Sequence, residues 1–117
     1  MATVKNFEDL EIWKMARELV NLIYLDLSKC RDYSFKDQIT RAGISIMNNI
    51  SEGFGRNSDQ EFRNFLNFAK GSCCEVKSMY YVAEDQKFVP VENTIDRRNR
   101  VQRINNAIGS FMTYLKK

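Results

Sequence analysis

The sequence contains no histidine among its 117 residues. Histidine is the side chain most often used as a general base near neutral pH and a frequent metal ligand, so its absence argues against most acid–base and metal-dependent catalysis. The sequence also lacks a nucleophile with an adjacent base, and it lacks the Glu-x-x-His pattern that holds metals in helical bundles. We therefore expect a protein that is not an enzyme and that uses no cofactor or metal.

Proline and long apolar runs are scarce as well. The chain has one proline and five glycines, which favours long helices over a sheet-rich fold. No apolar stretch approaches the roughly 18 residues that span a bilayer, so no membrane partner is expected. The three cysteines, Cys30, Cys73 and Cys74, are odd in number and lack CxxC spacing. Because no signal-like apolar run follows the N-terminus, we expect a cytoplasmic protein.

The composition is that of one ordinary globular domain. Apolar residues make up 44% of the chain and charged residues 28%, and the formal net charge is +3. The length is sufficient for a single modest core, so we expect residues 1–117 to form one domain. The mild positive charge permits contact with nucleic acid or an acidic partner but does not require it.

Apolar periodicity predicts four helices. They run from residue 7 to about 29, about 34 to 52, 58 to about 86, and about 93 to the C-terminus. Gly53 and Gly55 end the second helix, Ser58 and Glu61 form a capping box before the third, and Pro90 separates the last two. Because short connections join antiparallel neighbours, the prediction is an all-α, antiparallel up-down four-helix bundle without strands.

The first predicted helix is apolar over about half of its circumference, wider than the ~100° stripe that faces one core. Its apolar residues form two sets, the first being Trp13, Ala16, Val20, Ile23 and Leu27 and the second Ile12, Met15, Leu19 and Leu22. Either this helix lies deep among the other three, or the second set faces a neighbouring subunit. The pattern alone does not choose between these alternatives.

A polar strip on the second predicted helix breaks several helix rules together. Asn48 and Asn49 lie in mid-helix, and Glu52 lies in the last turn, where the helix dipole disfavours negative charge. The small pair Gly71 and Ser72 on the third helix indicates a close helix approach there. We predict a buried polar network that fixes helix register or subunit docking, with the members Arg41, Ser45, Asn49, Glu52, Ser72 and Glu75. The alternative, an active site of paired carboxylates beside an arginine, ranks below it.

Basic residues gather where the fourth predicted helix begins. They are Arg97, Arg98, Arg100 and Arg103. The helix dipole disfavours cations at that end, and the cost is better tolerated when arginines meet phosphate or carboxylate. We predict these four arginines as nucleic-acid contacts. The alternative is a solvated helix start, with some arginines paired to Glu84 or Asp85 across the end of the bundle.

Three blocks of the sequence resemble one known family. They are FEDLEIW at residues 7–13, SIMNNISEG at residues 45–53, and FLNFAKGS at residues 65–72, the last followed by Glu75. In this order, and over nearly the whole chain, they resemble the 23S rRNA intervening-sequence proteins. That family, also called the four helix bundle proteins, includes the accessory variability proteins of diversity-generating retroelements.

The resemblance implies a bundle that assembles as a ring, commonly a pentamer, and it favours a subunit contact for the second apolar set of the first helix. The implied partners are further copies of the chain, RNA or DNA, and a reverse transcriptase or another nucleic-acid enzyme. We therefore expect a non-catalytic homo-oligomer that binds structured RNA or DNA, or a nucleic-acid-handling partner, through basic surface. The alternative is a protein-binding scaffold without nucleic-acid contact.

Overall fold

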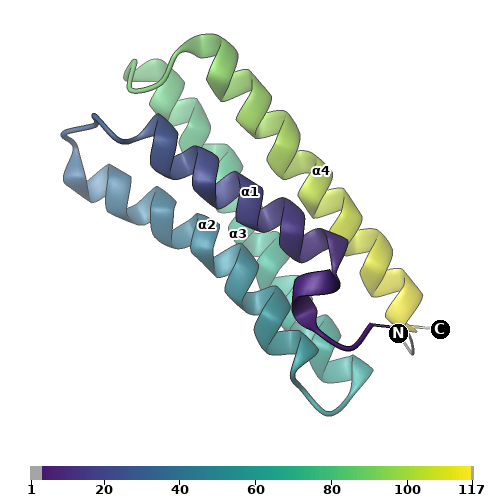
Figure 1. Cartoon of the computed structure of the whole chain (residues 1–117). Helices are drawn as coiled ribbons and strands as arrows, with labels where there is room; N and C mark the ends of the chain where they lie inside the picture. Colours follow the sequence, from purple (N-terminus) through teal and green to yellow (C-terminus); the bar gives the residue numbers. More distant parts are fainter. Residues whose placement is uncertain (1–3, 117) are drawn as a thin grey trace.

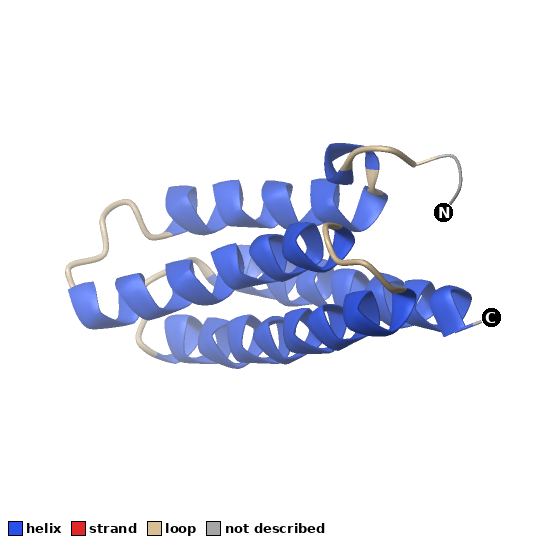
Figure 2. Ribbon diagram, turned by 90° about the horizontal axis from the view of Figure 1, so that it is seen from below, coloured by secondary structure: helices blue, strands red, loops and turns tan. Residues whose placement is uncertain are grey.

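The computed structural model describes residues 4–116, which form four long helices and one short 3₁₀ helix, with no strand in that range (Figures 1 and 2). The elements are η1 (Phe7–Asp9), α1 (Glu11–Asp26), α2 (Tyr33–Phe54), α3 (Asp59–Asp85) and α4 (Val91–Lys116). They pack into a bundle of 45 × 20 × 20 Å. The predicted all-α, antiparallel up-down four-helix bundle is therefore confirmed.

Each long helix packs alongside two neighbours, in the cyclic order α1, α2, α3, α4. Figure 1 shows the α1–α2 and α3–α4 connections at one end of the bundle, which we call the loop end. The α2–α3 connection, η1 and the last turn of α4 lie at the opposite end. The α1–α2 and α3–α4 edges consequently lie on opposite sides of the bundle. None of the helices among the described residues is both long enough and apolar enough to cross a membrane.

Local hydrogen bonds explain where the helices begin. The Asp32 carboxylate accepts from the backbone N–H of Phe35 at 3.1 Å and caps α2. The Ser58 hydroxyl accepts from the N–H of Glu61 at 3.2 Å, as the capping box predicts. The carboxylate of Glu61 returns to the N–H of Asn57, at 3.3 Å. Side-chain oxygens thus satisfy amide groups that the first turn of a helix leaves without partners.

The packing of the core shows whether the wide apolar face of α1 lies inside the bundle or faces a neighbouring subunit. Ile12 and Leu19, from the second apolar set, are 6% and 1% exposed and belong to the same core cluster as Ala16 and Ile23. Met15 packs against that cluster while half-buried. The expectation that this set faces another subunit is wrong for Ile12 and Leu19, because α1 lies deep enough among its neighbours to bury them, whereas Leu22 is half-buried.

Close helix approaches occur at glycines other than the predicted one. A Cβ atom at Gly53 would lie 2.7 Å from the Cβ of Phe65 and 2.8 Å from the Cδ1 of Phe62, so α2 and α3 approach closely there. A Cβ atom at Gly43 would lie 2.6 Å from the Cδ1 of Ile23. Gly71 is exposed, with nothing within 4 Å of an added Cβ atom, so the approach predicted for Gly71 and Ser72 is wrong for the glycine. Ser72 does contact α2, through a hydrogen bond from its hydroxyl to that of Ser45.

Candidate functional site

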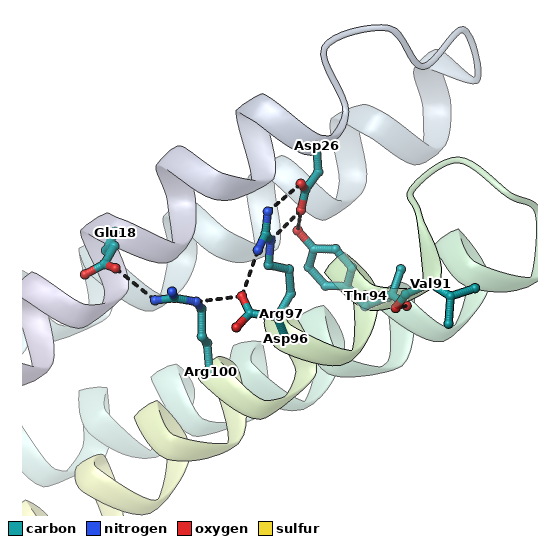
Figure 3. Close-up of polar contacts among 8 residues, drawn as sticks. Glu18, Asp26, Val91, Thr94, Asp96, Arg97 and Arg100 are labelled. Atoms are coloured by element: carbon teal, nitrogen blue, oxygen red, sulfur yellow. Dashed lines mark hydrogen bonds and ion pairs between the residues drawn. The ribbon is translucent and has the colours of Figure 1, made fainter.

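Arg97 lies inside the loop end of the bundle, with its side chain only 10% exposed. Its Nε and Nη2 atoms donate to Oδ2 and Oδ1 of Asp26 on α1, both at 2.8 Å (Figure 3). Its Nη1 atom donates to Oδ2 of Asp96 at 2.7 Å. The Asp26 side chain is 2% exposed, so this is a buried bidentate ion pair between α1 and α4.

A tyrosine from α3 completes the coordination of Asp26. Tyr80 is fully buried, and its hydroxyl donates to Oδ2 of Asp26 at 2.8 Å. Burial raises the pKa of the Tyr80 hydroxyl, and the negative Asp26 carboxylate raises it further. The hydroxyl therefore stays protonated and remains a donor at neutral pH. One buried carboxylate thus joins side chains from α1, α3 and α4.

Arg100 extends the ion pairs toward the surface. Its Nε atom donates to Oδ2 of Asp96 at 2.8 Å, and its Nη1 atom donates to Oε1 of Glu18 at 2.8 Å. The hydrogen bond from Arg100, and then that from Arg97, holds the pKa of the Asp96 carboxyl below its ordinary value. We call the connected set Glu18, Asp26, Tyr80, Asp96, Arg97 and Arg100 the ion-pair network.

Arg98 is held on the opposite side of α4, against α3. Its Nη1 atom lies 3.0 Å from Oε1 of Glu84, in an ion pair without the alignment of a full hydrogen bond. Its guanidinium lies over the ring of Tyr81, with Cζ 4.1 Å from the ring centroid. A hydrogen bond from the Thr94 hydroxyl to Glu84 at 2.8 Å lowers the pKa of that carboxyl, and Arg98 lowers it further.

The four predicted nucleic-acid contacts therefore occupy different environments. Arg97 is buried and its donors face carboxylates, so the prediction that it meets phosphate is corrected. Arg98 is paired with Glu84 of α3, which is the alternative that the sequence left open. Arg100 is paired with Asp96 of α4 and Glu18 of α1, two partners that the sequence did not suggest. Arg103 is exposed and forms no ion pair with any described residue.

A sequence signal for this arrangement existed. Arg97 follows the same spacing as the buried residues Val101, Ile104 and Ile108, so it belongs to the core-facing side of α4. Asp26 lies between Ile23 and Leu27, both fully buried, on α1. A cation and a carboxylate that each occupy an apolar face need one another, because an unpaired buried charge is strongly destabilising.

The structure brings together only part of the predicted polar network. The Asn49 amide donates to the backbone oxygen of Ser45 at 2.8 Å and to its hydroxyl at 3.0 Å, and the Ser72 hydroxyl donates to that same hydroxyl at 2.9 Å. These three side chains connect α2 to α3. Glu75 lies apart from them and accepts from the amide of Gln38 at 3.3 Å.

Arg41 and Glu52 are not part of this network, which corrects their assignment. Arg41 is 79% exposed and pairs with Asp37 at 3.0 Å, one turn before it on the same helix. Glu52 is 60% exposed and lies 3.8 Å from Arg56. Both residues lie on the outer part of the polar strip, beyond the helix contact. The partner of Arg41 is on α2 itself and that of Glu52 is in the connection that follows α2, so neither side chain pairs with α3.

The remaining groups with potential chemistry are metal-ligating side chains and the cysteine thiols. Among the described residues, no group of three or more histidine, cysteine, aspartate or glutamate side chains could hold a metal ion. Burial and, to a smaller extent, the neighbouring Cys74 together raise the pKa of the Cys73 thiol to about 12. Since the thiolate is the reactive form, Cys73 is a packing residue at neutral pH.

Comparisons with known proteins agree with the fold. The family model of the 23S rRNA-intervening sequence protein matches residues 8–110. The chain is also similar to the crystal structure of a protein with unknown function from the S23 ribosomal protein family of Bacteroides thetaiotaomicron VPI-5482. The two chains share 25% identity with a TM-score of 0.75, over 86% of this chain and 94% of that one. None of the curated proteins matches the chain.

Proposed function

Since the chain belongs to the 23S rRNA-intervening sequence protein family, we propose that it is a non-catalytic homo-oligomer that binds nucleic acid through basic surface. The proposed partners are further copies of the chain and structured RNA or DNA. The family resemblance implies that the copies assemble as a ring of five. A reverse transcriptase or another nucleic-acid enzyme is a further proposed partner, and the proposed location is the cytoplasm.

The distribution of charge carries this proposal. Arg97, Arg98 and Arg100 are paired with four carboxylates, those of Glu18, Asp26, Glu84 and Asp96. These pairs hold more negative than positive charge, so the remainder of the chain is more basic than the net charge of +3 indicates. Exposed cations without an ion pair among the described residues include Lys5, Lys14, Arg17, Lys29, Arg31, Lys87 and Arg103. Repetition around a ring would raise the local positive potential further.

An exposed apolar patch supports assembly. Its members are Tyr81, Val82, Val91 and Ile95, which lie where α3 ends and α4 begins, at the loop end. We call this set the α3–α4 patch. Grouped apolar side chains of this kind mark contact surfaces more often than isolated ones do. The patch takes the place of Ile12 and Leu19 as the proposed subunit contact.

The same patch favours a second candidate function, a protein-binding scaffold without nucleic-acid contact. Light scattering of the unmodified protein at micromolar concentration tests the shared part of both functions, and we expect a mass several times that of one chain. The variant Ile95→Glu should lower that mass while retaining its helical circular dichroism, because the side chain is exposed. A monomeric unmodified protein would contradict assembly in either function.

Fluorescence anisotropy with a labelled structured RNA at two salt concentrations separates the two functions. We expect binding that weakens steeply with salt, because phosphate contacts release counterions. Arg103→Gln should lower the slope of log affinity against log salt by roughly 0.7–0.9 for one lost phosphate contact. Arg100→Gln is the matched control, since that arginine is already paired with Asp96 and Glu18. An absence of RNA binding at low salt would favour the protein-binding scaffold over the nucleic-acid-binding function.

A further inference from the structure

An open groove lies between α1 and α2 at the loop end, on the side of the bundle opposite the α3–α4 patch. It has a volume of about 610 Å³ and is lined by Tyr24, Tyr33, Ser34, Lys36, Asp37 and Thr40. Tyr24 comes from the last turns of α1, and Tyr33 is the first residue of α2. Neither the ion-pair network nor the packing of the core uses these side chains.

Two tyrosine rings in this groove lack partners. Tyr24 and Tyr33 are 53% and 68% exposed, and neither makes a hydrogen bond or ring contact with any described residue. Other tyrosines at the same end are used, since Tyr80 is buried against Asp26 and Tyr81 is covered by Arg98. Two exposed aromatic faces on adjacent elements are surfaces on which planar groups can stack.

The margins of the groove are positively charged. Lys36 lines it, and the connection at residues 27–32 carries Lys29 and Arg31, both exposed and without ion pairs to described residues. Arg17 lies two helical turns before Tyr24 on α1, with its guanidinium 5.7 Å from the ring centroid of Trp13. These cations can reach a chain of phosphates that follows the groove.

The carboxylates near the groove are already engaged. Asp32 caps α2 by accepting from the N–H of Phe35. Asp37 is paired with Arg41 at 3.0 Å. Asp26, the remaining acid of this region of α1, is buried against Arg97 on the α4 side. Asp32 keeps its negative charge, because a backbone N–H is neutral, but Lys29, Arg31 and Lys36 outnumber it and leave the field at the groove positive.

We propose that this groove binds single-stranded nucleic acid, with bases stacked on Tyr24 and Tyr33 and phosphates held by Lys36, Arg31 and Lys29. The proposal rests on the proposed function and narrows its ligand to unpaired strands or loops of RNA or DNA. Aromatic side chains stack on bases that are free of a duplex, whereas the paired bases of a helix leave no face open. Sequence preference should be weak, because every base has a face on which to stack.

The test measures anisotropy of labelled oligouridylate, oligothymidylate and a duplex, each about 12 nucleotides long, within the ~4–16 nucleotides that single-strand sites span. We expect the full-length protein to bind the single strands more tightly than the duplex, and a comparison of the two strands separates RNA from DNA. The double variant Tyr24→Ala/Tyr33→Ala should bind single strands at least about 20-fold more weakly, because each stacked base contributes ~1–3 kcal/mol.

Matched variants isolate stacking from other effects. Tyr24→Phe/Tyr33→Phe keeps the aromatic faces and should bind like the unmodified protein. Phe68→Ala removes another exposed ring, on α3 and away from the groove, and should leave binding unchanged. Lys36→Gln should flatten the salt dependence for single strands, which a loss of stacking alone would not do.

The outcomes separate this inference from the function on which it rests. If the double alanine variant keeps its fold and mass and binds single strands with unchanged affinity, the groove is not the site, although the protein still binds nucleic acid. If the unmodified protein binds no nucleic acid, both proposals fail. A double alanine variant that dissociates into monomers would show that the groove is a subunit contact, which overturns the inference.

Photocrosslinking of the unmodified chain to a thiouridine-containing oligonucleotide gives a test without variants. Crosslinks mapped to Tyr24, Tyr33 or the residues beside them support the groove. Crosslinks confined to other surfaces of the bundle, such as the region of Arg103, overturn it.

Discussion

Removal of the Arg97 charge should destabilise the protein more than any other single change to an arginine of α4. Its guanidinium is the principal partner of Asp26, to which it donates two hydrogen bonds at 2.8 Å. Arg97→Met keeps most of the side-chain volume, so the change removes the charge and the hydrogen bonds without opening a large cavity. Asp26 would then remain 2% exposed with only the Tyr80 hydroxyl as its donor.

The magnitude follows from the two partners of Asp26. One hydrogen bond to a charged group contributes ~1.5–3 kcal/mol, whereas burial of an uncompensated carboxylate costs several kcal/mol. Tyr80 alone therefore cannot hold the charge, and we expect Arg97→Met to lower the free energy of unfolding by about 3–5 kcal/mol. That is a large part of the ~5–15 kcal/mol by which a domain is stable.

Urea unfolding monitored by far-ultraviolet circular dichroism measures this free energy. Arg100→Met is the matched control, and because its side chain is 33% exposed we expect a loss of about 1 kcal/mol or less. The double variant Asp26→Asn/Arg97→Met leaves no buried charge and should recover a substantial part of the loss. If Arg97→Met unfolds within about 1 kcal/mol of the unmodified protein, the reasoning from a buried charge is refuted.

Two further predictions concern glycines and acid. Gly71→Ala should raise the free energy of unfolding by about 0.5–1 kcal/mol, because alanine favours the helix and no atom lies near the added Cβ. Gly53→Ala should lower it by about 1–3 kcal/mol, because the added Cβ atom would collide with side chains of α3. Equal effects at the two sites in urea unfolding would contradict this contrast. Hydrogen bonds lower the pKa values of Asp96 and Glu84 below the ordinary 3.8 and 4.5, so both carboxylates favour the folded state at neutral pH. Thermal melting should therefore show stability lost as the pH falls through and below these values, and higher stability in acid would contradict it.

The fold could be predicted because its determinants are local in the sequence. Apolar periodicity indicates the helices, while Ser58 and Pro90 mark boundaries that the structure places within a few residues of the expected positions. The width of the apolar face of α1 was harder to interpret. A wheel shows how much of a helix is apolar but not how deeply neighbours enclose it, and here the enclosure buries Leu19 to 1% exposure.

The site residues were harder to predict because their partners are remote in the sequence. Arg97 is 71 residues from Asp26, and Ser72 is 27 residues from Ser45. The helix dipole correctly indicated that arginines at the start of α4 need anions, but it could not distinguish phosphate from a carboxylate on another helix. Arg41 and Glu52 were wrongly assigned for a different reason. A polar strip on one helix does not show which of its side chains face the neighbouring helix and which face solvent.

The ion-pair network and the tyrosine groove share the last turns of α1, and this affects how binding data should be interpreted. Tyr24 lies two residues before Asp26, so the pair with Arg97 fixes the part of α1 that forms one wall of the groove. A change at Arg97 would therefore weaken nucleic-acid binding even though its guanidinium contacts no phosphate. The salt dependence distinguishes a lost phosphate contact from a loss of folded protein. A lost phosphate contact flattens the slope of log affinity against log salt, whereas a loss of folded protein lowers the affinity and leaves that slope unchanged. We expect Arg97→Met to show weaker binding with an unchanged slope, and Lys36→Gln to show a reduced one.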